Sequence, residues 1–151
     1  MIKINVEINN KSWKKKIKHP KKYFNCKLKK IPKIIKFFKN KNVTFTILLT
    51  NSLNMKKLNK KFRKLNKSTD ILSFPTFPPK TLKLIKEKKI YIGDLAASYE
   101  IIHARAKNNN FFKEFDKVWV HGLLHLIGYD HIKNLDYYKM HKIEKRILSL
   151  I

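Results

Sequence analysis

The chain has 151 residues, 43% of them apolar, which suits one domain over residues 1–151 with a single core. No apolar run approaches the roughly 18 residues of a membrane-spanning helix, and the first residues lack the apolar stretch of a signal peptide. Cys26 is the only cysteine, which excludes an internal disulfide and a cysteine-based zinc site. We therefore expect a cytoplasmic protein with neither a membrane nor a disulfide-linked partner.

The formal net charge is +26, from 36 Lys and Arg against 10 Asp and Glu. Such a surface attracts polyanions, and nucleic acid is the usual one. Codon bias explains the excess equally well, because Lys, Asn, Ile and Phe, which have A/T-rich codons, are all abundant. Only three of the 36 basic residues are arginines. A bias toward A/T-rich codons does not account for the presence of these three as it does for the lysines: Arg63, Arg105 and Arg146.

Alternating and helical spacings predict the elements of the first half of the chain. Alternation predicts a strand over residues 2–6, and helical spacing predicts a helix over residues 28–38. No element is predicted for residues 11–22. Residues 43–49 are rich in β-formers and predict a second strand. Ser52 is expected to cap the next helix, whose buried side would hold Leu53, Leu58, Phe62 and Leu65.

The second half predicts two strands, over residues 71–74 and 90–97, with a loop at residues 78–79 between them. Helices are predicted from near Ser98, over residues 114–127 and over residues 135–148, the last with Tyr137, Met140, Ile143 and Ile147 on its apolar side. Strands mixed with helices predict an α+β fold. We expect a small mixed sheet of about four strands, with a central helix that carries the motif described next.

Three of the six histidines fall in the segment HGLLHLIGYDH, residues 121–131. His121 and His125 are four residues apart, so a helix places both imidazoles on one face. Gly128 can end that helix in the left-handed conformation and return His131 to the same face. Three imidazoles with one open position are typical of catalytic zinc, so we predict one Zn²⁺ per chain. The alternative is a set of helix-cap and core histidines.

The segment is related to the metalloprotease pattern H-E-x-x-H-x-x-G-x-x-H, with Gly122 in place of the glutamate base. Peptide hydrolysis needs that base, so the sequence disfavours a protease. A glycine beside the first ligand is expected to leave room for a phosphate near the metal.

Three further residues are candidates for the site. Arg63 offers a rigid fork of donors suited to phosphate, although an exposed arginine at a helix end is the alternative. Asp94 and Asp130 are candidates for a carboxylate that orients a ligand histidine, or else for structural roles at a bend and a turn.

Together these motifs resemble the YbeY family of bacterial endoribonucleases. Residues 121–131 match every fixed position of the family signature H-G-x-L-H-L-x-G-Y-D-H. The resemblance extends over roughly residues 43–150 and departs in the turn over residues 64–68 and in residues 95–97. Further matches are residues 69–75 to T-D-V-L-S-F-P, residues 93–95 to G-D-I, Leu58, Asn59 and Arg63 to an upstream motif, and Met140 and Glu144 to the closing helix.

The resemblance implies a metal-dependent, single-strand-specific endoribonuclease that acts near the 3′ end of small-subunit rRNA and in ribosome quality control. It also implies a central helix against a four-stranded sheet. We expect a zinc-activated water, or the RNA 2′-OH, to attack the phosphodiester while Arg63 stabilises the developing charge. His121 and Arg63 are thus the expected catalytic residues. The alternatives are a metalloprotease-like hydrolase and a non-catalytic RNA-binding ribosome-assembly factor.

Overall fold

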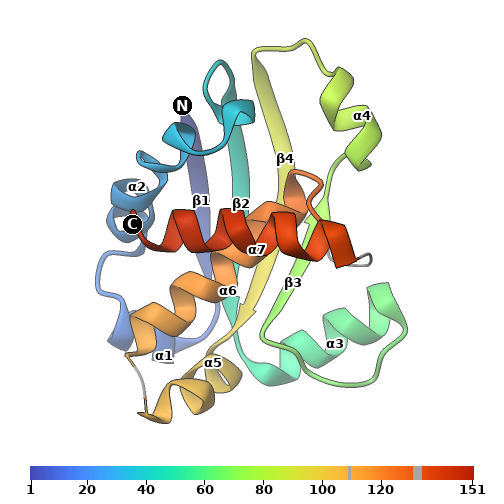
Figure 1. Cartoon of the computed structure of the whole chain (residues 1–151). Helices are drawn as coiled ribbons and strands as arrows, with labels where there is room; N and C mark the ends of the chain where they lie inside the picture. Colours follow the sequence, from blue (N-terminus) through green and yellow to red (C-terminus); the bar gives the residue numbers. More distant parts are fainter. Residues whose placement is uncertain (109, 131–133) are drawn as a thin grey trace.

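A four-stranded mixed sheet of order β1-β2-β4-β3 runs through the computed structural model (Figure 1), which describes residues 1–108, 110–130 and 134–151. Strands β1 (Ile2–Ile8), β2 (Asn42–Thr50) and β4 (Lys89–Ser98) are parallel neighbours. Strand β3 (Ile71–Pro75) pairs with β4 in the antiparallel sense at one edge. All four strands lie where alternation and β-propensity predict them, which confirms the expected mixed sheet.

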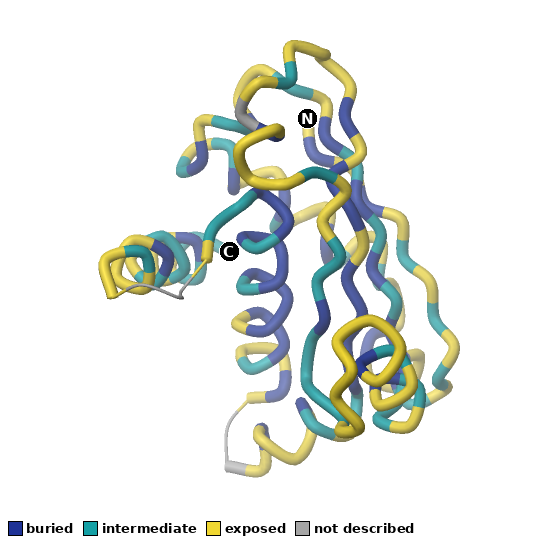
Figure 2. The backbone as a smooth tube through the Cα atoms, turned by 90° about the vertical axis from the view of Figure 1, so that its right-hand side faces the viewer, coloured by how far each residue is buried: buried dark blue, intermediate teal, exposed yellow. Residues whose placement is uncertain are grey.

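Helices cover both faces of this sheet (Figures 1 and 2). Buried residues of α6 and α7 join the main core on one face, whereas α3 packs on the other face through Met55, which contacts Leu72 and Ala96. No helix in the described part of the chain is long and apolar enough to cross a membrane. The helices are α1 (Lys11–Lys16), α2 (Pro20–Leu28), α3 (Ser52–Arg63), α4 (Pro79–Leu84), α5 (Tyr99–Arg105), α6 (Phe111–Leu126) and α7 (Asn134–Leu148).

Helix α6 corresponds to the helix predicted over residues 114–127. The side chain of Asn110 caps it by accepting the Phe112 N–H. Its buried Asp116 accepts hydrogen bonds from Tyr23 Oη at 2.6 Å, Lys27 Nζ at 2.7 Å and Trp119 Nε1 at 2.8 Å. Burial of a carboxylate is tolerated only with such partners, so this cluster fixes α2 against α6.

The predicted helix over residues 28–38 is wrong. The chain instead forms α2, which ends at Leu28, and then two short 3₁₀ helices, Ile31–Lys33 and Lys36–Phe38. Pro20 begins α2, where its missing N–H breaks no helical hydrogen bond. Pro32 would break the interior of a longer helix, and it instead lies in the first turn of a separate 3₁₀ helix. Ile31, Ile35 and Phe38 are nevertheless buried. Their apolar spacing therefore reports burial correctly but not the backbone conformation.

Some predicted details of α3 are wrong, whereas Leu58 packs against the cluster of Met55, Leu72 and Ala96 as predicted. Asn51, and not Ser52, caps the helix by accepting the Asn54 N–H at 2.8 Å. The helix buries Met55 and Asn59. Asn59 Nδ2 donates to the Lys67 carbonyl at 2.8 Å, and this hydrogen bond satisfies its buried amide and holds the side of α3 that carries both residues toward the protein interior. The predicted loop lies at residues 76–78, and α4 begins at Pro79. Several apolar side chains that were expected on buried helix sides are exposed: Leu53, Phe62, Leu65 and Tyr137.

Candidate functional site

Two histidines meet on one side of α6, close to its C-terminal end. His121 and His125 lie one helical turn apart and are both partly exposed. Their Nε2 atoms are 3.0 Å apart, and their ring centroids are 4.6 Å apart. The structure thus brings together the pair that their spacing predicts.

The other nitrogen of each ring has an acceptor. His121 Nδ1 lies 2.6 Å from Glu144 Oε1 on α7, and His125 Nδ1 lies 3.0 Å from the backbone carbonyl of Tyr129. A carbonyl and a carboxylate can only accept, so these partners assign the ring hydrogen to Nδ1 in both histidines. In the neutral imidazoles, both Nε2 atoms therefore present lone pairs.

Two lone pairs that face each other at 3.0 Å repel unless a proton or a metal ion lies between them. Zn–N bonds of about 2.0–2.1 Å in tetrahedral geometry separate two ligand nitrogens by roughly 3.3 Å. The observed separation is close to this value. A carboxylate or backbone carbonyl behind each imidazole is also the usual arrangement around metal-ligating histidines. The pair therefore fits a zinc-like metal through its donor chemistry.

The turn after α6 follows the sequence prediction. Gly128 has φ of +85°, a conformation that side chains rarely adopt, and its N–H donates to the His125 carbonyl at 3.0 Å. Tyr129 comes next, and its carbonyl reaches back to His125. His131, the third expected ligand, lies outside the described residues. Asp130 is exposed and lines a cavity beside Tyr129.

Gly122 does not leave space beside the histidines, contrary to the sequence interpretation. It is buried against the sheet, and a Cβ there would lie 2.9 Å from Leu95 Cδ2 and 3.0 Å from Ile71 Cδ1. Ser73 Oγ also donates to the Gly122 carbonyl at 3.3 Å. The glycine therefore allows close packing of α6 on β3 and β4, and leaves no space there for a phosphate.

Two other candidates lie away from the histidine pair. Asp94 lies on the same side of β4 as Ala96, the side that α3 covers, and accepts a hydrogen bond from Tyr91 Oη at 2.5 Å. Arg63 is the exposed last residue of α3, on the face of the sheet opposite α6. The structure brings neither residue to the histidines.

Asp70, Arg105 and Glu144 line the same cavity as His121, although the sequence predicts no catalytic or binding role for them. A cavity of about 450 Å³ between α5, α6 and α7 is lined by His121, Glu144, Asp70 and Arg105, with Lys117 and Lys145. Arg105 pairs with Asp70, whose other oxygen accepts the Ile71 N–H at 2.8 Å. Glu144 follows Met140 and precedes Ile147 on the buried side of α7. An acidic residue at that helical spacing was the available signal for Glu144.

The family model for the endoribonuclease YbeY matches residues 7–151, nearly the whole chain and more than the region of motif resemblance. The chain belongs to the YbeY endoribonuclease family. It is 46% identical to the endoribonuclease YbeY of Pelagibacter ubique, over 100% of this chain and 97% of the relative. It is 34% identical to the endoribonuclease YbeY of Bartonella bacilliformis, over 100% and 94%. Membership confirms the family resemblance on which the sequence expectations rest.

A solved structure shows the same fold. The solution structure of a target protein from Thermotoga maritima is 27% identical and superposes with a TM-score of 0.61, over 99% of this chain and 87% of that chain. The fold of this chain is thus shared by a solved structure over nearly its whole length.

Proposed function

We propose that this member of the YbeY family is a zinc-dependent endoribonuclease that cuts single-stranded RNA. The observation that carries the proposal is the pair of Nε2 atoms 3.0 Å apart, each backed by an acceptor at Nδ1. That arrangement favours one bound cation per chain. Action near the 3′ end of small-subunit rRNA, and in the cytoplasm, is proposed on the family resemblance alone.

Each residue has a definite task in this proposal. His121 and His125 hold the metal, with His131 as the expected third ligand. Glu144 and the Tyr129 carbonyl keep the two imidazoles in the tautomer that directs Nε2 toward the metal. When bound, a metal of this type supplies Lewis-acid activation of water and of phosphoryl oxygens.

RNA is the substrate that the surroundings of His121 favour. Arg105, Lys117 and Lys145 line the cavity beside it, and Asp70 and Glu114 hold two of these cations in place. A guanidinium fixed by a carboxylate presents its remaining donors in a defined direction, which suits a phosphate oxygen. The chain's net charge of +26 adds non-specific attraction for the rest of the strand.

The test uses the full chain loaded with zinc and the same preparation stripped by a chelator. We expect only the loaded protein to cut single-stranded RNA from the 3′ region of small-subunit rRNA, and to leave duplex RNA and casein intact. Zinc-dependent cleavage of casein would favour the metalloprotease alternative. RNA binding without cleavage, in protein with a full complement of zinc, would favour the assembly-factor alternative.

Comparison of Arg105→Lys with Arg63→Lys identifies the arginine that acts at the reacting phosphate. Loss of a donor that contacts the developing charge costs about 100- to 1,000-fold in rate. The sequence assigned this role to Arg63, but the cavity that reaches His121 contains Arg105. We therefore expect the larger loss in Arg105→Lys, measured as the single-turnover cleavage rate at one stated salt concentration.

Each of these variants is the matched control for the other, because both preserve the net charge. RNA affinity should change little in either, since non-specific binding depends on the number of neutralised phosphates. A loss confined to Arg63→Lys would restore the assignment made from sequence. Parallel falls in affinity and rate in Arg105→Lys would make it a docking residue only.

A further inference from the structure

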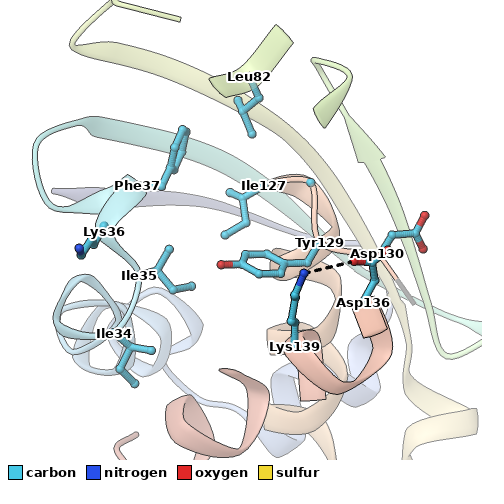
Figure 3. Close-up of a pocket in the computed structure, with 11 residues that line it drawn as sticks. Ile34, Ile35, Lys36, Phe37, Leu82, Ile127, Tyr129, Asp130, Asp136 and Lys139 are labelled. Carbon is cyan, nitrogen blue, oxygen red and sulfur yellow. Dashed lines mark ion pairs between the residues drawn. The ribbon is translucent and has the colours of Figure 1, made fainter. Parts of the chain in front are cut away.

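A second cavity, of about 610 Å³, lies beside the segment that follows α6 (Figure 3). One wall is the segment from Ile127 to Asp130, directly after α6, and the facing wall is the segment from Ile34 to Phe37. Leu82 of α4 and the first turns of α7 complete it. Its volume lies within the range of roughly 300–1,000 Å³ that is typical of small-ligand sites.

The cavity has an apolar interior and a charged rim. Figure 3 shows the side chains of Tyr129, Ile127, Phe37 and Leu82 around the hollow, with Lys139 beside Tyr129. Lys139 Nζ lies 3.9 Å from Asp136 Oδ1. Both aromatic residues are only partly buried. Lys41 Nζ lies over the Phe37 ring, 5.9 Å from its centroid, so a cation already stacks on one of these rings.

The backbone connects this cavity directly to the histidine pair. The side chain of Tyr129 lines the cavity, while its carbonyl accepts the hydrogen bond from His125 Nδ1 at 3.0 Å. A ligand that contacts the Tyr129 ring therefore touches the same residue whose carbonyl orients His125.

We propose that this cavity binds one unstacked nucleobase of the RNA strand next to the phosphate that is cut. The inference rests on the proposed ribonuclease function and specifies where that site reads its substrate. Aromatic side chains stack on the faces of bases, and polar groups at a rim can reach the base edges. The unstacked base that this requires is available in single-stranded RNA and unavailable in a duplex.

A nucleobase fits the cavity better than an apolar side chain of a protein partner. Lys36 and Lys139 line the cavity, where they suit the phosphates on either side of a bound base. Asp130 and Asp136 also line it, and their carboxylates can accept hydrogen bonds from the amino groups of a base edge. The combination of aromatic rings, an apolar floor and nearby cations is that of sites for single-stranded nucleic acid.

The test measures binding to zinc-free protein, so it does not depend on catalysis. A short single-stranded RNA carries the fluorescent base 2-aminopurine at each position in turn, and a parallel set carries an abasic site. We expect an abasic site at one position to weaken binding by about 5- to 150-fold, the value of one stacked base. At that position, the 2-aminopurine emission should change on binding.

Tyr129→Leu and Phe37→Leu remove the rings but keep the apolar volume and, at Tyr129, the carbonyl that holds His125. Both variants should lose the abasic effect and the fluorescence change. Tyr138→Leu is the control, because Tyr138 is 68% exposed on α7 and does not line the cavity. Unchanged zinc content in the variants would show that their histidine site is intact.

The possible results separate this inference from the proposed function. Equal effects of abasic sites at all positions, with cleavage intact, would overturn the base site and leave the ribonuclease proposal standing. An apolar side chain of a protein partner would then be the better occupant. A base-dependent signal without cleavage by the zinc-loaded protein would support the base site and overturn the ribonuclease.

Discussion

His125→Ala is expected to abolish stoichiometric zinc binding and RNA cleavage while leaving the fold intact. The substitution removes one of the two Nε2 atoms that face each other at 3.0 Å. His125 is partly exposed, and alanine has the higher helix propensity, so the free energy of unfolding of zinc-free protein should change little. Zinc affinity is measured by competition with a chromophoric chelator, and the cleavage rate is measured in single turnover.

A graded series makes this prediction specific. Glu144→Gln keeps the shape but removes the charge behind His121, and changes of this kind typically weaken metal binding by about 10- to 100-fold. His125→Ala should exceed that loss, and His19→Ala, at an exposed site before α2, should match wild type. Full zinc content in His125→Ala would refute the assignment of His125 as a ligand.

Gly122→Glu, which recreates the metalloprotease motif, is expected to destabilise the protein by about 3–5 kcal/mol without conferring peptidase activity. The new side chain would enter the contact between α6 and the sheet, where Leu95 and Ile71 already approach the missing Cβ position. Overpacking of such a contact costs about 1–3 kcal/mol, and a buried carboxyl without partners adds a comparable or larger penalty. The free energy of unfolding is measured by urea denaturation of zinc-free protein.

Gly122→Ala is the control for this substitution. Its single methyl group meets the flexible ends of Leu95 and Ile71, and the higher helix propensity of alanine offsets part of the crowding. We expect a change within about 1 kcal/mol. A stable Gly122→Glu protein with zinc-dependent peptidase activity would show that position 122 faces the metal, against the packing described here.

Alternation predicts the sheet well because burial on one face imposes it directly. Val43, Phe45, Ile47 and Leu49 are each fully buried, at every second position of β2. Helix α1 gives no such signal, since Trp13 alone is buried among lysines and is held by its Nε1 hydrogen bond to the Thr50 carbonyl at 2.9 Å. Trp13 also packs against Tyr99, Phe111 and Phe115, so α1 depends on long-range contacts that local sequence does not reveal.

Residues within the candidate site differ in the same way. The spacing of His121 and His125 on one helix is enough to predict that they meet. The partners of these histidines come from other elements, Glu144 from α7 and the Tyr129 carbonyl from the turn, so only the tertiary structure identifies them. The environment of Gly122 also depends on tertiary structure. A Cβ at this position would meet Leu95 and Ile71 of the sheet, and local sequence does not show which side of the helix faces the sheet there.

The central position of β4 determines the order in which the chain can fold. Strand β4 lies between β2 and β3, although it follows both in the sequence. Until β4 is synthesised, only the β1–β2 pair can form, and two isolated strands are marginally stable in water. Long-range parallel pairing is also slow. A nascent chain that ends before Lys89 therefore has no stable sheet, and its apolar strands lack the cover of α6 until that helix leaves the ribosome.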